Sequence, residues 1–82
     1  MKPLLSYQTE IGTFYIAKSD DNLFHPTFND IDLGAYENLW LAVEDVASNS
    51  TIPVHHPETN EVIDTSTLAI PEDYIEWERI RG

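Results

Sequence analysis

The sequence predicts a single α+β domain over residues 1–82. Two patterns indicate this fold class: apolar and polar residues alternate as in half-buried strands in the first half of the chain, and apolar residues then recur at helical spacing from Leu39. The short length allows one hydrophobic core. We expect an antiparallel sheet of three to four strands with one amphipathic helix packed on one face, then a long loop and a short C-terminal helical turn and strand.

The first strand is predicted over residues 13–17, where Phe14 and Ile16 share one face and Tyr15 lies on the other. We expect this strand to continue from residues 5–9 through a bend or bulge at Gly12, because glycine tolerates backbone angles that other residues avoid.

A hairpin is predicted around Asn29 and Asp30, because both residue types tolerate the positive φ of tight turns. The turn joins residues 23–28 to residues 31–36. Pro26 cannot donate a ladder hydrogen bond, which predicts an edge position or a bulge there. A two-residue loop places three pairs on one apolar face: Phe28 with Ile31, Pro26 with Leu33, and Phe24 with Ala35.

The helix is predicted from Asn38 to Ser48, with Asn38 as its N-cap and Asn49 as a left-handed residue after its end. Glu44 and Asp45 fall on the solvent side. The apolar stripe contains Leu39, Ala42, Val43 and Val46, widened by Trp40 and Ala47.

The segment after the helix is expected to be a polar surface loop over residues 50–67, with a short strand at residues 61–63. Pro71 suits the first turn of a helix, which predicts a helical turn over residues 71–75. Residues 77–80 are expected to add a final strand.

The charge restricts the possible partners, since 15 acidic residues against four basic ones give a formal net charge of −11. Such a domain repels nucleic acid and anionic membranes, so neither is expected as a direct partner. A neutral or basic protein is the expected partner. The chain has no cysteine, no signal-peptide pattern and no apolar stretch near the ~20 residues of a membrane span, which predicts a cytoplasmic protein.

Three short motifs carry a family resemblance: Gly12-Thr13-Phe14-Tyr15-Ile16, Leu33-Gly34-Ala35-Tyr36, and the segment from Pro71 to Glu78. They resemble the G-T-F-x-I, L-G-x-Y and P-x-D-x-x-E-W-E patterns of a group of small uncharacterised bacterial proteins. The resemblance implies a bacterial origin and one compact fold, and it implies no activity or cofactor.

No catalytic motif stands out in the chain. The sequence lacks a cysteine nucleophile, a G-x-S-x-G elbow and a glycine-rich phosphate loop, and His25 lies in a predicted strand where a structural or surface role is usual. We therefore predict neither an enzyme nor a cofactor.

The adjacent His55 and His56, with Glu58 nearby, are the best candidate metal ligands. Neighbouring histidines chelate one ion poorly and no metal-site spacing is present, so no metal is predicted. A small-ligand or metal-binding domain that uses these loop histidines and carboxylates is the alternative function.

The leading hypothesis is a non-enzymatic protein-interaction or inhibitor-like module. Acidic and aromatic residues gather near the C-terminus, a combination suited to a basic partner. Trp40 and Trp77 are either interface residues or core-filling residues, and the small size of the domain favours the core. The sequence does not specify an oligomeric state. The candidate partner-binding residues are Glu72, Asp73, Tyr74, Glu76, Trp77 and Glu78.

Overall fold

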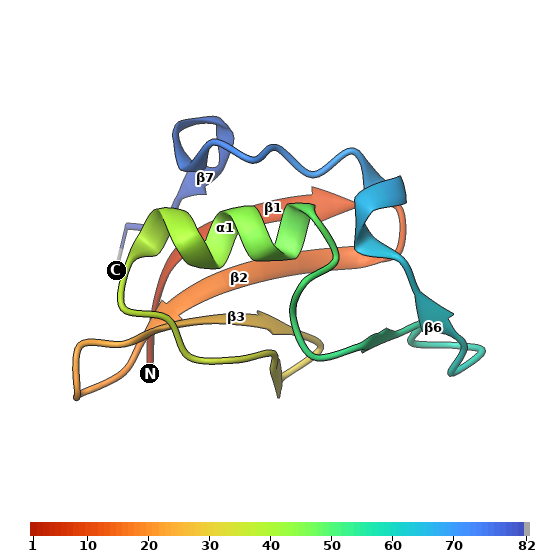
Figure 1. Cartoon of the computed structure of the whole chain (residues 1–82), viewed down its shortest axis with the longest axis horizontal. Coiled ribbons are helices and arrows are strands. Elements are labelled where there is room, and N and C mark those ends of the chain that lie inside the picture. The colour runs from red at the N-terminus through yellow and green to blue at the C-terminus, as the bar shows by residue number, and fades with distance from the viewer. Residues whose placement is uncertain (82) are drawn as a thin grey trace.

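The computed structural model describes residues 1–81 and has an α+β fold in which one helix lies against one face of a five-stranded antiparallel sheet (Figure 1). We call the covered face the inner face. The sheet order is β4-β3-β2-β1-β7, and β5 and β6 form a separate two-stranded sheet. The elements are β1 (Lys2–Thr9), β2 (Gly12–Lys18), β3 (Phe24–Phe28), β4 (Ile31–Asp32), α1 (Leu39–Ala47), β5 (Val54–His55), β6 (Val62–Ile63), the 3₁₀ turns η1 (Thr65–Leu68) and η2 (Tyr74–Glu76), and β7 (Glu78–Arg79).

The sheet has more strands than predicted because the segment expected to be one bent strand is a hairpin. β1 and β2 pair antiparallel up to Thr9 opposite Gly12, and the chain reverses at Glu10 and Ile11. The prediction of a continuous strand was wrong. Neither Glu10 nor Ile11 is a residue type that commonly forms turns, so the sequence did not indicate a turn at these positions. Gly12 follows the turn with a φ of 137°, and a Cβ there would lie 3.1 Å from the ring of Phe28.

The tight turn between β3 and β4 is confirmed. Asn29 and Asp30 have φ values of 53° and 65°, as a turn with two left-handed central residues requires, and Phe28 pairs with Ile31.

The predicted register of this hairpin holds through Leu33, whose amide bonds to the Pro26 carbonyl, and is wrong beyond Leu33. Gly34 has a φ of 145°, and the bridge that follows joins Phe24 to Tyr36 instead of Ala35. The extra residue leaves Ala35 exposed. Ile31 is also 51% exposed at the end of the hairpin, so the six paired residues do not share one buried face.

The irregularity predicted at Pro26 occurs on the side of β3 that faces β4. The carbonyl of Pro26 accepts a hydrogen bond from the Leu33 amide at 2.8 Å. The Leu33 carbonyl would normally receive an N–H from the residue at position 26, which proline lacks. It accepts instead from the Ile52 amide at 3.2 Å, and this bond ties the segment after α1 to the sheet.

The helix occupies the predicted region, and Asn49 is left-handed as expected, with a φ of 61°. Its stripe buries Ala42, Val43, Val46 and Ala47. Trp40 was predicted to widen this stripe but is 48% exposed, because at 100° per residue it lies on the flank of the stripe.

The segment over residues 50–67 is more structured than predicted. It contains the β5–β6 hairpin, whose Val54 is buried, and the expected short strand is present at Val62–Ile63. The hydroxyl of Thr65, a fully buried residue, donates to the Val46 carbonyl of α1.

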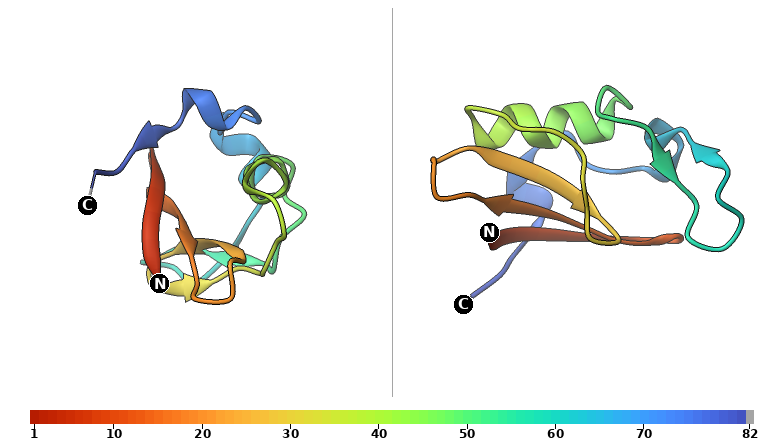
Figure 2. Two further views of the ribbon diagram at one scale, coloured as in Figure 1. Left: turned by 90° about the vertical axis from the view of Figure 1, so that its left-hand side faces the viewer. Right: turned by 90° about the horizontal axis from the view of Figure 1, so that it is seen from below.

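The C-terminal turn and strand are both present, with shifted bounds. The helical turn is η2, which begins at Tyr74 and not at Pro71, because Asp73 caps it. The expected final strand is β7, which pairs with β1 through Ser6 opposite Glu78. Figure 2 shows that the segment from η1 to β7 crosses from the helix side to the β1 edge.

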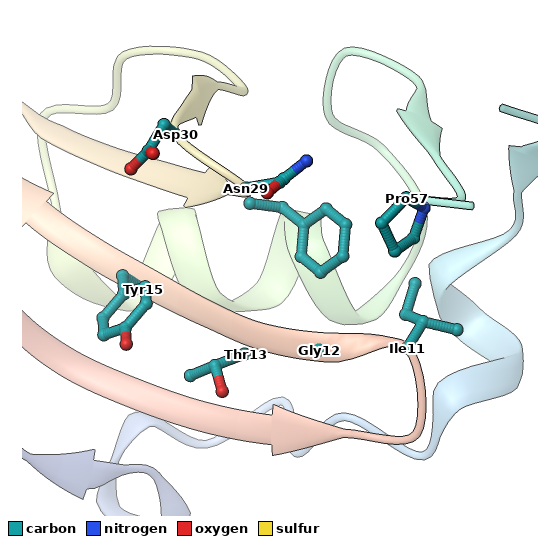
Figure 3. A pocket seen from close by; sticks show the side chains of 8 residues that line it. Ile11, Gly12, Thr13, Tyr15, Asn29, Asp30 and Pro57 are labelled. Carbon is teal, nitrogen blue, oxygen red and sulfur yellow. The ribbon is translucent and has the colours of Figure 1, made fainter.

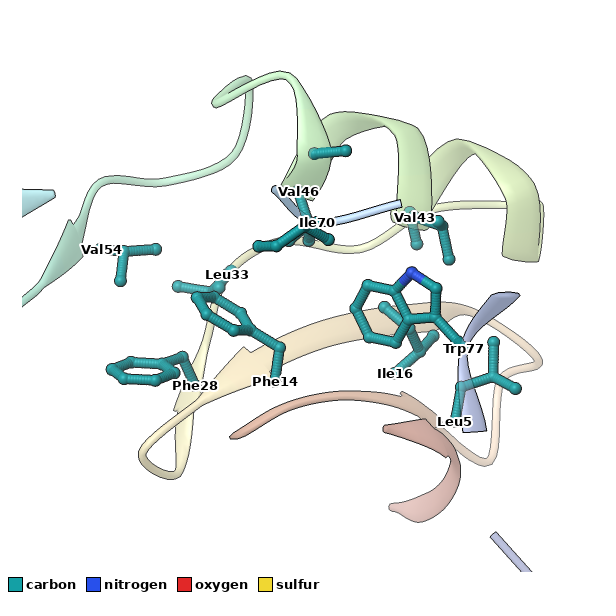
Figure 4. Packing of buried hydrophobic residues seen from close by; sticks show 12 residues of the cluster. Leu5, Phe14, Ile16, Phe28, Leu33, Val43, Val46, Val54, Ile70 and Trp77 are labelled. Atoms are coloured by element: carbon teal, nitrogen blue, oxygen red, sulfur yellow. The ribbon is translucent and has the colours of Figure 1, made fainter. Parts of the chain in front are cut away.

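The core lies between α1 and the inner face of the sheet (Figure 4). The rings of Phe14 and Phe28 stack with centroids 4.5 Å apart. Val43 and Val46 face them from the helix, and Trp77 enters the same layer from the C-terminal segment. No helix within residues 1–81 is long and apolar enough to cross a membrane.

We expect Val46→Asp to destabilise the fold by more than about 4 kcal/mol, because Val46 is 0% exposed and an unpaired carboxylate would enter the hydrophobic core. Urea denaturation followed by circular dichroism measures this. Glu44→Ala, on the exposed side of the same helix, is the control and should change the free energy of unfolding by less than about 0.5 kcal/mol. Equal midpoints for the two variants would contradict the packing of α1.

Candidate functional site

The C-terminal segment is held at both ends by buried side chains. Ile70 is 7% exposed and Trp77 is 3% exposed. The indole Nε1 of Trp77 donates to the Pro71 carbonyl at 3.0 Å, and its ring lies 5.7 Å from that of Tyr7 on β1. These contacts close the chain between Pro71 and Trp77 into a loop fixed on the core.

A hydrogen-bonded turn orders the middle of this loop. The Asp73 carboxylate accepts from the Ile75 amide at 3.0 Å, and the Asp73 carbonyl accepts from the Glu76 amide at 3.0 Å. The Trp77 amide then donates to the Tyr74 carbonyl at 3.1 Å. Asp73 therefore has a structural role as the cap of η2 in addition to its charge.

Four acidic residues of this segment form what we call the C-terminal acidic patch: Glu72, Asp73, Glu76 and Glu78, all of which are exposed. Within residues 1–81 the ion pair present joins His25 to Asp32, so the patch carboxylates have no cationic partner there. They remain available to an external cation.

The aromatic candidates of this segment are placed differently from the acids. Tyr74 is half-buried and Trp77 belongs to the core, so the tryptophan cannot supply a surface contact. The exposed apolar side chain is that of Ile75, at 74% exposure, which the sequence reasoning missed. The core position favoured for Trp77 is confirmed, but it did not by itself indicate that Ile75, two residues earlier on η2, would be exposed.

The structure also brings together three residues that the sequence did not associate. His25 Nδ1 lies 3.0 Å from Asp32 Oδ2, and His25 Nε2 lies 3.1 Å from Ser19 Oγ. This is the order of a Ser-His-Asp relay. The Ser19 hydroxyl, however, donates to Asp21, and this bond lowers the pKa of the Asp21 carboxyl.

The proton that a relay would transfer is therefore already donated to a carboxylate. Asp20 and Asp21 would also repel an oxyanion that formed next to Ser19. We assign this cluster a structural role: it braces the β2–β3 turn against β4, in agreement with the role expected for His25.

The loop histidines make local contacts. His56 Nδ1 accepts from the Glu58 amide at 3.1 Å, which closes the β5–β6 turn, and His55 Nδ1 lies 3.3 Å from the Asn60 carbonyl. Among residues 1–81 no group of three or more metal-ligating side chains converges.

A hollow of about 280 Å³ lies beside the β3–β4 turn (Figure 3). Tyr15, Asp30 and Pro57 are among its lining residues. Neither His55 nor His56 lines it, so the loop histidines and this hollow do not form one site.

The surroundings of Tyr36 strongly raise the pKa of its phenol. Burial of its phenol, together with the nearby Asp45 carboxylate on α1, raises the pKa of Tyr36 from 10.0 to about 12.

No known protein family, curated protein or solved structure matches this chain. The resemblance to small bacterial proteins therefore stays a prediction from short motifs, and function is argued from the surface.

We expect one of the four tyrosines to titrate near pH 12 in an ultraviolet absorbance titration, and this step to vanish in Tyr36→Phe. A raised pKa means that folding favours the neutral phenol. The resulting stabilisation is complete below pH 10.0 and is lost as the pH rises through about 12. Circular dichroism at each pH shows whether the chain is still folded. Asp45→Asn should lower the pKa of Tyr36, because it removes the neighbouring negative charge. A single step for all tyrosines would contradict this assignment.

Calorimetric titration with Zn²⁺ should show no stoichiometric uptake, because no ligand set converges within residues 1–81. The double variant His55→Ala, His56→Ala is the control and should give the same trace. Tight uptake that this variant abolishes would support the metal-binding alternative.

Proposed function

We propose that this protein is a small cytoplasmic, non-enzymatic interaction module that binds a basic protein through the C-terminal acidic patch. The observation that carries the proposal is the exposure of four carboxylates: three lie on the segment whose ends, Ile70 and Trp77, are anchored in the core, and the fourth, Glu78, follows directly on β7. No ion pair within residues 1–81 neutralises them.

The anchoring supports a recognition role because it reduces the entropy lost on binding. Trp77 and Ile70 hold the ends of the segment, and the Asp73 cap orders η2 between them. A partner therefore meets carboxylates on a pre-ordered backbone, and less conformational freedom has to be lost when the complex forms.

The net charge of −11 supports a basic partner in particular. A strong overall field accelerates the encounter with a cationic surface, and the acidic patch would then set the orientation of the complex. An inhibitor-like role follows if that surface is a groove in which the partner holds nucleic acid, since the carboxylates would occupy the positions of phosphates.

The test compares three baits in affinity capture from the native host: the parent protein, a patch variant and a control variant. The patch variant carries Glu72→Gln, Asp73→Asn and Glu76→Gln, and the amide oxygen introduced at position 73 can still accept the capping bond. The control variant carries Asp20→Asn, Glu58→Gln and Glu61→Gln, which change the net charge equally at exposed positions elsewhere.

We expect a basic protein to be retained by the parent and control baits and lost by the patch variant. Its association rate with the parent should fall about tenfold as added salt shortens the Debye length from ~30 Å to ~8 Å. Surface plasmon resonance measures this rate. Retention by all three baits with unchanged kinetics would show that the acids serve solubility.

A further inference from the structure

An apolar hollow of about 260 Å³ lies next to the C-terminal acidic patch. It sits between the first turn of α1, η2 and the edge where β7 pairs with β1, elements that lie together in Figure 1. Leu5 is buried, and the other apolar lining residues are half-buried and so keep surface open to a ligand. The lining residues are Leu4, Leu5, Leu39, Tyr74, Arg79 and Ile80.

A local irregularity of β1 creates this hollow. Consecutive strand residues normally point to opposite faces, yet Leu4 and Leu5 both line the hollow because the register shifts between Pro3 and Leu5. The Leu4 carbonyl accepts from the Ile80 amide at 2.9 Å, which places Ile80 beside Leu4 past the end of β7. Part of the apolar surface is thus left uncovered at the edge of the core.

The size and charge of the site indicate its occupant. The hollow is smaller than the ~300–1,000 Å³ of pockets that hold whole small molecules, so it fits a single side chain. Tyr74 in its wall lies between Asp73 and Glu76 of the acidic patch in the sequence. Arg79, also in the wall, can donate to a backbone carbonyl of the docked segment.

We propose that this hollow receives one aliphatic side chain of the protein partner, carried on a segment in which lysine or arginine flanks that side chain. The inference rests on the proposed function and deepens it, because it names the sequence class that the partner presents: the apolar side chain supplies affinity and the flanking cations meet the acidic patch.

Two peptides of equal charge test whether the hollow binds an aliphatic side chain. They are acetyl-Lys-Lys-Leu-Lys-Lys-amide and its analogue with serine at the centre. Titration into ¹⁵N-labelled protein, followed by amide chemical shifts, gives the affinity and the location of each. We expect the leucine peptide to bind about tenfold more tightly, since partial burial of a leucine side chain contributes about 1.4 kcal/mol. The shifts should centre on Leu39, Tyr74 and Ile80.

A filled hollow provides the variant test. Leu39→Trp should remove the preference for leucine, whereas Val62→Trp should keep it, because Val62 is 66% exposed on β6 and no residue of β6 lines the hollow. Figure 1 shows β6 at the opposite end of the molecule from β7. The amide spectrum of each variant reports whether it is folded, and the comparison of the two peptides on the parent protein does not depend on either variant.

The outcomes separate this inference from the proposed function. If both peptides bind equally, and the patch variant but not the control variant weakens their binding about fivefold, the hollow does not bind the leucine side chain. The proposal that the acidic patch binds a basic partner would then be retained. Binding of the leucine peptide whose affinity neither salt nor the patch variant lowers would overturn the basic flanks, and the proposed function with them. A leucine preference that is lost in Leu39→Trp, together with an affinity for both peptides that falls in the patch variant, would support both.

Discussion

Burial of one apolar layer between α1 and the inner face of the sheet is the constraint on which the rest of the structure depends. A chain of 82 residues has room for one such layer, and it draws on both ends of the chain. Leu5 enters it from β1 and Trp77 enters it from the C-terminal segment, while Val43 and Val46 cover it from the helix. Because the C-terminal segment contributes to the core, its carboxylates are held on a fixed backbone.

The connections outside this layer are fixed by single polar contacts. Proline at position 26 leaves the Leu33 carbonyl without its strand partner, and the Ile52 amide takes that place. The Thr65 hydroxyl, bonded to the Val46 carbonyl, holds the end of the polar segment against α1. A buried backbone carbonyl needs a hydrogen-bond donor. In both cases the donor comes from a segment distant in the sequence, and the bond holds that segment against the core.

The candidate surface follows from the same arrangement. Charged side chains of the C-terminal segment stay in water because burying an unpaired carboxylate is strongly unfavourable, whereas Trp77 is drawn inward and satisfies its N–H at the Pro71 carbonyl. Ile75 is exposed on η2, and the open hollow beside Leu4 lies where the register of β1 shifts and the last residues pair with that strand. The features on which the proposed recognition depends therefore gather where the last strand joins the sheet.

Local sequence by itself determined the α+β class, the helix and the tight turn at Asn29 and Asp30, because periodicity and turn chemistry are properties of neighbouring residues. It also placed acidic residues near the C-terminus. Only the tertiary structure decided that the first predicted strand is a hairpin and that the register of the second hairpin, β3–β4, changes at Gly34. It confirmed the core position favoured for Trp77 but left Trp40 exposed, and it alone brought Ser19 to His25, because strand pairing and burial depend on contacts between residues distant in the chain.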